Sequence, residues 1–476
     1  MGSKIVSSFK WTTVERFSVQ SVQFVLGIII ARLVTPEEYG VLGILMVFVT
    51  VSQVFIDSGL GSALICQNDL RREDVQTTFT FNLLVSLFFC AVLFVAAPYI
   101  EAFYALEGLA AYMRVVSLML ITNSLIVVPT TIFKVRLDFR SLAISNICST
   151  VISGLIGVCL AYCGYGVWAL VGQVMSKSAL QSVFLYVQCR WLPTFSFSLK
   201  AFKGLYKYGV NVFFSTFITR ITDEGSAFII AKVLTPFNLG VYSRSCHFVT
   251  LPSSCLGSII NVVMFPAFSS LKNDRAMFNH IHRKAIECQA AVTMPLYIAF
   301  ALAAEPLILI LLTDKWIAVV PVLQIMCCGR LLSLIVNITE QVLLARGRSD
   351  LFLKQQLVKM GTKFVLVMLA LPMGILAVAA ADAVATLSNF AVTNYFARGV
   401  SEFRVREQLR AVLPYLLSSF VAGAAGLGAY MLADNVYVRL ALVLAVYAAV
   451  YYAAVTFVCR KTTLNEIINR VISYKR

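Results

Sequence analysis

The sequence is poor in charged side chains and holds only three histidines. Of its 476 residues 13% are charged and 59% are hydrophobic, and the mean hydropathy is +0.85. Because a soluble domain carries roughly 25% charged residues, an ordinary cytosolic protein is excluded. Glycine (25) and proline (12) are also too scarce for a fibrous or disordered chain. The abundant component is apolar sequence, which predicts an all-α protein that crosses a membrane many times.

The sequence also lacks motifs for catalysis and metal binding. None of its twelve cysteines forms a CxxC pair, and no glycine-rich phosphate loop, DxD, HExxH or GxSxG occurs. We expect the cysteines to be small buried hydrophobic residues. His280 and His282 fall in a segment expected to be a solvated basic loop, with no further ligand nearby. We therefore predict that the chain is not an enzyme and holds no cofactor or metal.

Hydropathy predicts about fourteen transmembrane helices joined by short loops. Apolar runs bounded by charges, proline or glycine fall near 14–33, 40–62, 77–97, 109–131, 141–163, 165–188, 207–231, 240–262, 286–304, 319–344, 358–377, 378–397, 412–433 and 437–459.

The basic residues indicate how these helices are oriented. If the N-terminus is cytoplasmic, the predicted inside segments hold 28 lysines and arginines, and the outside segments hold only Arg32, Lys232, Lys315 and Arg439. Such a bias is typical of cytoplasmic loops, so we expect both termini to be cytoplasmic. The net charge of +16 then reflects membrane topology and requires no nucleic acid partner.

An internal repeat predicts the architecture. Residues 28–41 (IIIARLVTPEEYGV) and 228–241 (FIIAKVLTPFNLGV) are identical at seven of fourteen positions. Turn chemistry alone explains Thr-Pro and Gly, but it does not explain the matched Ile-Ile-Ala. Six spans separate the copies, so both halves enter the membrane in the same direction. We predict two six-helix lobes as parallel repeats, with the substrate between them. The expected ranges are 1–200 and 201–400, followed by helices 13–14 and a cytoplasmic tail over 401–476.

Ionisable residues within the predicted spans indicate a polar interior. Fourteen of them lie in or at the edge of a span, and on lipid-facing helix centres they would cost on the order of 40 kcal/mol in total, at about 3 kcal/mol each. Helical spacing places several groups on single faces. These are Arg16, Gln20 and Gln23; Arg220, Asp223 and Glu224; Arg330, Ser333, Asn337 and Glu340 with Gln341; and Asp382, Thr386, Asn389 and Thr393.

Two interpretations of these polar faces are open: contacts between helices held by polar side chains, or walls of one shared cavity. The three stripes that begin at Arg16, Arg330 and Asp382, together with Arg244 and Lys363, favour a cavity. Arginine suits a ligand that carries phosphate. The hypothesis assigns substrate binding to Arg16, Gln20, Arg220, Arg244, Arg330 and Lys363. It assigns ion coupling or charge balance to Asp223, Glu224 and Asp382.

Several sequence blocks resemble polysaccharide exporters of the MOP superfamily over about residues 3–365. They include GSKIVSSFKWTTVERF, ARLVTPEEYGVLG and FIDSGLGSALICQNDLRREDVQTTFTFN in the first half. AKVLTPFNLGVYSRS, FPAFSSLKNDRAMF, LLTDKWIAVVPVLQIM and LLARGRSDLFLK look like the corresponding blocks of the second half. The resemblance is nearest to colanic- or teichuronic-acid exporters and O-antigen flippases.

This resemblance implies a multi-pass protein of the bacterial inner membrane with two six-helix lobes and an added helix pair. It would move undecaprenyl-diphosphate-linked oligosaccharide to the outer leaflet by alternating access, for exopolysaccharide, O-antigen or capsule synthesis. Proton or sodium coupling, and contacts with membrane lipids and other polysaccharide assembly proteins, remain open. Two alternatives are a cation-coupled drug antiporter on the same scaffold and a membrane-embedded glycan polymerase or glycosyltransferase. The antiporter predicts acidic residues without surplus arginine, and the enzyme predicts a large outside loop.

Overall fold

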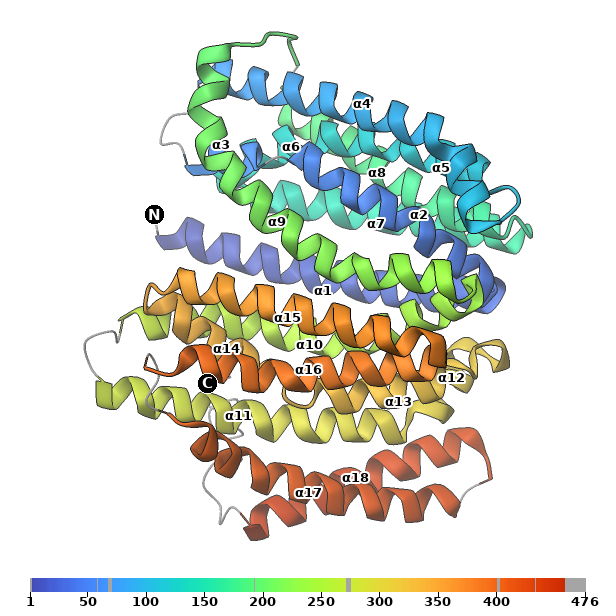
Figure 1. Ribbon diagram of the computed structural model, residues 1–476, viewed down its shortest axis with the longest axis vertical. Helices are drawn as coiled ribbons and strands as arrows, with labels where there is room; N and C mark the ends of the chain where they lie inside the picture. The colour runs from blue at the N-terminus through green and yellow to red at the C-terminus, as the bar shows by residue number, and fades with distance from the viewer. Residues whose placement is uncertain are drawn as a thin grey trace. The chain divides into compact units, whose positions relative to one another are not determined.

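The computed structural model describes residues 2–57, 59–66, 71–191, 193–270, 275–399, 403–432 and 434–458, apart from some side chains within helices. In these ranges all regular elements are helices, which confirms the predicted all-α class (Figure 1). The helices form two compact units, residues 1–240 and residues 241–476. Eleven helical segments are long and apolar enough to cross a membrane.

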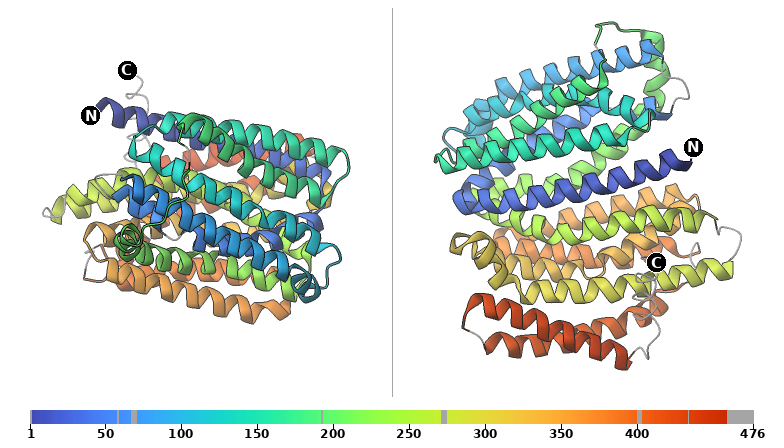
Figure 2. Two further views of the ribbon diagram at one scale, coloured as in Figure 1. Left: turned by 90° about the horizontal axis from the view of Figure 1, so that it is seen from above. Right: turned by 180° about the vertical axis from the view of Figure 1, so that it is seen from behind.

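The first unit is an antiparallel bundle in which long helices run side by side (Figures 1 and 2). Its elements are α1 (Gly2–Leu33), α2 (Pro36–Asp57), α3 (Leu60–Cys66), α4 (Arg72–Tyr104), α5 (Leu109–Ser117), α6 (Met119–Val135), α7 (Phe139–Tyr162), α8 (Val167–Cys189) and α9 (Leu199–Val233).

The second unit contains the remaining helices, with the first turn of α10 belonging to the first unit. Its elements are α10 (Pro236–Ser270), α11 (Arg275–Leu302), α12 (Ala304–Leu312), η1 (Asp314–Trp316), α13 (Val319–Arg330), α14 (Ser333–Ala345), α15 (Ser349–Ala370), η2 (Leu371–Met373), α16 (Ile375–Ala397), α17 (Val405–Met431) and α18 (Val436–Val458).

Several helices extend well beyond their apolar runs, and this corrects one prediction. Helix α11 begins at Arg275, so His282 is helical and not part of a solvated loop. Its ring is fully buried, at 5.8 Å from the Phe268 ring and 5.5 Å from the Phe403 ring. Hydropathy marks only the apolar part of a helix, whereas polar turns continue the same helix beyond it.

Small residues let helices α1, α7 and α8 pack closely in the first unit. A Cβ atom added to Gly154 would lie 2.0 Å from the Leu26 side chain, and one at Gly157 would meet Gln173. The buried core beside them contains Ile30 and Leu170. Close approach at small residues is the usual way that membrane helices gain contacts, since burial from water contributes nothing within lipid.

The two copies of the repeat touch one another within the first unit. A Cβ atom added to Gly40 would lie 1.8 Å from the carbonyl oxygen of Pro236, and one at Gly240 would lie 1.9 Å from that of Pro36. The contact is therefore reciprocal, as equivalent residues related by a two-fold axis require. The repeated Thr-Pro-x-x-x-Gly sequence places glycine where the first turns of α2 and α10 meet.

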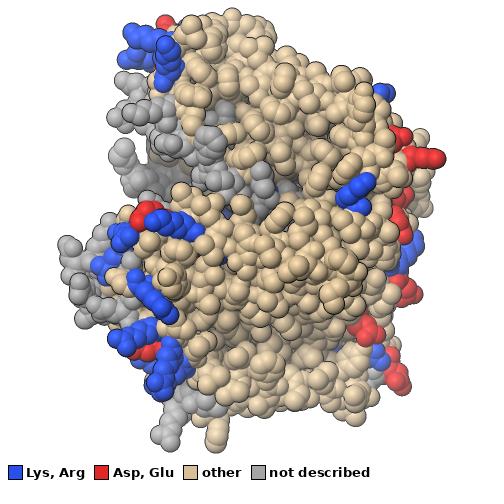
Figure 3. Space-filling view, viewed as in Figure 1, with Lys and Arg blue, Asp and Glu red and all other residues tan. Residues whose placement is uncertain are grey.

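Charged residues separate along the helices on the visible face of the molecule. In each unit lysines and arginines gather at one end, whereas most aspartates and glutamates lie toward the other (Figure 3). Large apolar side chains are exposed on these helices, among them Phe88, Val95 and Leu369. An apolar band between charged ends is what a bilayer requires of a spanning protein.

Candidate functional site

An ion pair between neighbouring helices forms the centre of the candidate site in the second unit. The Lys363 Nζ atom on α15 lies 3.0 Å from Asp382 Oδ1 on α16. The carboxylate is almost fully buried, whereas 26% of the Lys363 side chain is exposed. Because α15 and α16 pack along their lengths, the pair joins two helices that follow one another in the chain.

Three further side chains surround this pair. Arg330, at the end of α13, interacts electrostatically with Lys363, and Cys246, on α10, interacts with both Lys363 and Asp382. Tyr242 lies one helical turn before Cys246 on α10 and hydrogen-bonds to it. The Tyr242 hydroxyl group also interacts electrostatically with Asp382 and Arg330. We call these five residues the basic cluster. It contains two cations and one carboxylate, so it carries a net positive charge inside the unit.

The structure thus brings together three of the nine predicted site residues, namely Arg330, Lys363 and Asp382. Sequence reasoning missed Tyr242 and Cys246, although their spacing of four residues, directly after the second copy of the repeat, was a usable signal. Within the predicted stripe on α16, the Thr386 hydroxyl donates to the Asp382 backbone carbonyl at 2.8 Å.

Arg244 faces a different environment from the basic cluster. It lies midway between Tyr242 and Cys246 in sequence, which turns it to another face of α10. Its guanidinium carbon lies 5.7 Å from the centre of the buried Trp316 ring, an arrangement typical of a cation–π contact. Arg244 therefore packs against η1.

The stripe predicted from Arg330 to Glu340 is divided by the structure. Helix α13 ends at Arg330 and α14 begins at Ser333, so the two halves are not one regular helix. Glu340 accepts hydrogen bonds from Gln355, Gln356 and Lys359 on α15, and the ion pair with Lys359 is largely buried. Glu340 thus joins α14 to α15.

The other predicted residues lie in the first unit. Arg16 on α1 is exposed and Gln20 is half-buried, while the neighbouring Glu15 accepts a hydrogen bond from Asn146 at 2.6 Å. Arg220 on α9 is exposed and interacts electrostatically with Asp57 at the end of α2. The side chains of Asp223 and Glu224 lie outside the described residues.

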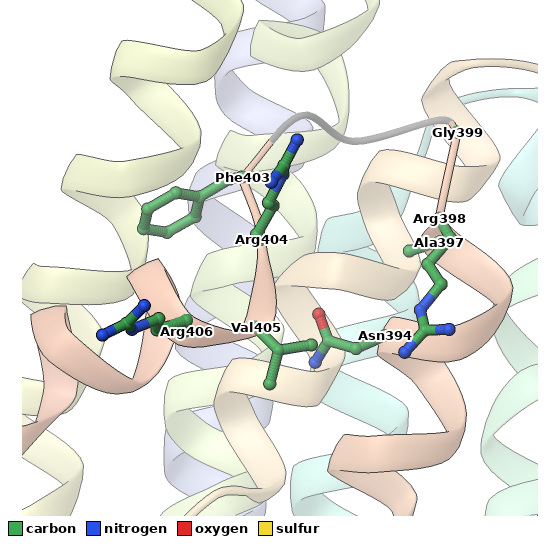
Figure 4. Close-up of a pocket in the computed structure, with 8 residues that line it drawn as sticks. All are labelled: Asn394, Ala397, Arg398, Gly399, Phe403, Arg404, Val405 and Arg406. Carbon is green, nitrogen blue, oxygen red and sulfur yellow. The ribbon is translucent and has the colours of Figure 1, made fainter.

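A pocket of about 530 Å³ lies between the end of α16 and the start of α17 (Figure 4). Gln408 of α17 donates to Asn394 of α16 at 2.8 Å, and this bond joins the two helices. It also donates to the Phe403 carbonyl, just before α17, at 3.0 Å. Three arginines line the pocket, but their guanidinium groups point in different directions, so they do not converge on one ligand. They are Arg398, Arg404 and Arg406.

The fold defines a class, a multi-pass helical membrane protein. Among solved structures, a lipid II flippase MurJ in an inward-closed conformation superposes with a TM-score of 0.77 at 14% identity, covering 94% of this chain and 98% of that one. An inward-facing multidrug resistance transporter of the MATE family, itself named as a member of the MOP superfamily, gives 0.62 at 13% identity, covering 81% of this chain and 98% of that one.

The chain belongs to the family described as polysaccharide biosynthesis protein, whose profile matches residues 29–321. The teichuronic acid biosynthesis protein TuaB of Bacillus subtilis is 24% identical over 350 residues, 73% of this chain and 72% of TuaB. The succinoglycan biosynthesis transport protein ExoT of Rhizobium meliloti is 26% identical, over 67% of this chain and 65% of ExoT. The lipopolysaccharide biosynthesis protein WzxC of Escherichia coli is 20% identical, over 74% of this chain and 72% of WzxC.

This assignment answers the alternatives left open by the sequence. Family and fold are those of transporters and not of enzymes. The matching family concerns polysaccharide synthesis and does not favour the drug antiporter. With its many apolar helices and bacterial relatives, the chain is a multi-pass protein of the bacterial inner membrane.

Proposed function

We propose that this chain translocates oligosaccharide linked to undecaprenyl diphosphate across the cytoplasmic membrane by alternating access, for the synthesis of a surface polysaccharide. The observation that carries the proposal is the basic cluster, since a net positive charge that is only partly exposed between membrane-spanning helices calls for an anionic ligand. The relatives are named for three different polysaccharides. A diphosphate on a lipid carrier is a chemical group that such substrates can share.

The proposed topology is fourteen spans with both termini in the cytoplasm. Helices α8, α9 and α10 are each longer than the roughly 20 residues that a span requires, and counting them with the eleven apolar segments gives fourteen. The sequence repeat supports two six-helix lobes over 1–200 and 201–400, with α17 and α18 as the added pair. Segregation of basic residues to one helix end supports the cytoplasmic placement of that end.

In the proposed mechanism the diphosphate competes with Asp382 for the ammonium group of Lys363. The exposed part of Lys363 lets its flexible side chain turn toward a ligand, and Arg330 adds a planar group suited to phosphate oxygens. Asp382 is then left buried without its partner, which is unfavourable unless a cation joins it. A proton or sodium ion bound at Asp382 would link its own movement to that of the substrate.

The remaining predicted residues have supporting roles in this proposal. We assign substrate contacts to Arg16, Gln20 and Arg220 in the first unit and keep Asp223 and Glu224 as candidates for ion coupling. Arg244 is the least favoured of the predicted ligands because it packs against Trp316. Any ligand that prefers one arrangement of the lobes shifts the population toward it, and this difference in affinity drives alternating access.

The test is transport by charge variants of the purified full chain in proteoliposomes. The double variant Lys363→Gln/Asp382→Asn removes both charges together and so avoids leaving one buried charge unpaired, which would cost about 3–5 kcal/mol. We expect it to fold and to lose most transport of a lipid-linked oligosaccharide, as Arg330→Gln should. Lys315→Gln, at an exposed position on η1, is the matched control. Normal transport by both charge variants would remove the cluster from the mechanism.

A further inference from the structure

An open groove of about 500 Å³ lies on the first unit, lined almost wholly by apolar side chains. Its walls come from α4 and α9, and α2 and α3 contribute Phe55 and Leu60. On α4 the lining residues Phe81, Leu84 and Phe88 recur at helical spacing, with Val85 and Phe89 beside them. The volume falls within the range of about 300–1,000 Å³ that is usual for ligand pockets.

Aromatic rings form both the floor and one end of this groove. The Phe55 ring stacks on Phe89 at 4.7 Å and lies 5.2 Å from Phe213 of α9. At the end nearest the helix starts, the Phe81 and Phe202 rings are 4.9 Å apart. The edges remain uncovered in the described structure, since Leu84, Phe88 and Tyr206 are 59%, 63% and 53% exposed.

The aromatic end of the groove adjoins a basic rim. The start of α9 is tied to the first turns of α4, because the Ser198 backbone N–H donates to Thr77 Oγ1 at 3.1 Å. Four exposed basic residues lie at these two helix starts: Arg71, Arg72, Lys200 and Lys203. The carboxylates of Glu73 and of the buried Asp74 share the first turn of α4, so the rim keeps a positive surplus.

We propose that this groove binds the polyisoprenoid chain of the lipid-linked substrate when the diphosphate lies at the basic rim, a position that the substrate occupies before or after its diphosphate binds the basic cluster. An apolar channel that ends in cations matches a molecule with one long hydrocarbon chain and an anionic head. A single groove accepts one chain, whereas a phospholipid carries two. This inference rests on the proposed function and adds a second contact for the same substrate, distinct from the basic cluster.

The test uses two photoreactive lipids with the purified full chain in nanodiscs. One is a polyprenyl diphosphate with a diazirine on its chain, and the other is phosphatidylglycerol with a diazirine on an acyl chain. Labelled peptides are identified by mass spectrometry. We expect the polyprenyl probe to label peptides of α4 and α9 that line the groove, and Phe88→Ala/Tyr206→Ala to lower that yield at least fivefold.

The controls separate loss of the groove from loss of the fold. Leu87→Ala/Tyr99→Ala changes exposed residues of α4 that do not line the groove, and it should leave labelling unchanged. Leu84→Trp adds bulk at the open edge and should also reduce labelling. Equal labelling of the groove by phosphatidylglycerol, or unchanged labelling in the groove variants, would overturn the inference.

The same experiment distinguishes failure of this inference from failure of the proposed function. If the polyprenyl probe labels α10, α15 or α16 but not the groove, only the groove assignment is wrong. If the probe labels no part of the chain above the level of phosphatidylglycerol, the proposed substrate class is wrong as well.

Discussion

Replacing Gly40 with alanine should force apart the two copies of the repeated turn. The new methyl carbon would lie 1.8 Å from the Pro236 carbonyl oxygen, whereas real Cβ contacts stay beyond 3.0 Å, so the turns must separate by more than 1 Å. A backbone carbonyl cannot rotate away as a side chain can. Overpacking typically costs about 1–3 kcal/mol, and we expect about 3 kcal/mol here. Gly240→Ala should have a similar effect, because its contact with Pro36 is reciprocal.

The assay is thermal unfolding of the purified chain in detergent. At about 2–4 °C per kcal/mol for a unit of this size, a cost of about 3 kcal/mol lowers Tm by about 6–12 °C. The double variant should fall by less than the sum of the single variants, since both changes relieve the same contact. Gly204→Ala in α9 is the control, because nothing lies within 4 Å of its added Cβ. A helical glycine in open space should gain about 0.5–1 kcal/mol on becoming alanine.

The reasoning would be refuted if Gly40→Ala and Gly204→Ala melted at the same temperature. It would also be refuted by strictly additive losses in the double variant, because additivity means that the two glycines act at independent contacts.

Two further predictions concern the second unit. Lys359→Met leaves Glu340 largely buried without its cation, which should cost about 3–5 kcal/mol, and Glu340→Gln added to it should restore part of the lost Tm. If the single and double variants melt alike, the pair is not the cause. Trp316→Ala should cost about 3–5 kcal/mol because the ring is fully buried. Trp316→Phe keeps a ring beneath Arg244 and should cost less stability. The midpoints of chemical denaturation measure both variants. Equal losses of stability in the two variants would exclude the ring contact.

Two features of the fold were predictable from the sequence: the membrane-spanning helices, from the apolar runs, and the paired turns, from the internal repeat. Apolar runs of about 20 residues have few alternatives to a helix in a membrane, and the repeat at 28–41 and 228–241 marked two turns that prove to touch. The helix limits were less predictable, because a helix can continue with polar residues beyond the membrane, where the apolar run stops. Helix α9 covers Leu199–Val233 although the apolar run begins near 207. The break predicted between 377 and 378 was a few residues late. Helix α15 ends at Ala370, and the short helix η2, which contains Pro372, ends at Gly374, whose φ is 91°.

The candidate site was predictable only as separate faces of single helices. Periodicity placed Asp382 on a polar face, but it carries no information about which neighbouring helix meets that face, so the partnership with Lys363 required the structure. Periodicity likewise could not identify the partner of Glu340, which pairs with Lys359 on the neighbouring helix and not with the residues of its own stripe. Arg244 shares α10 with Tyr242 and Cys246, yet it lies two residues from each of them. The helical rotation over two residues turns its side chain toward Trp316.

The central claim is tested most directly by the sidedness of lipid-linked glycans in spheroplasts of a strain that lacks this chain. An impermeant reagent that modifies glycans is added outside, and the lipid-linked intermediates are then extracted and analysed. The account predicts that intact intermediates accumulate and stay protected on the cytoplasmic side, and that restoring the wild-type chain exposes them. Intermediates that are fully accessible but unpolymerised would contradict it, since translocation would then proceed without this protein.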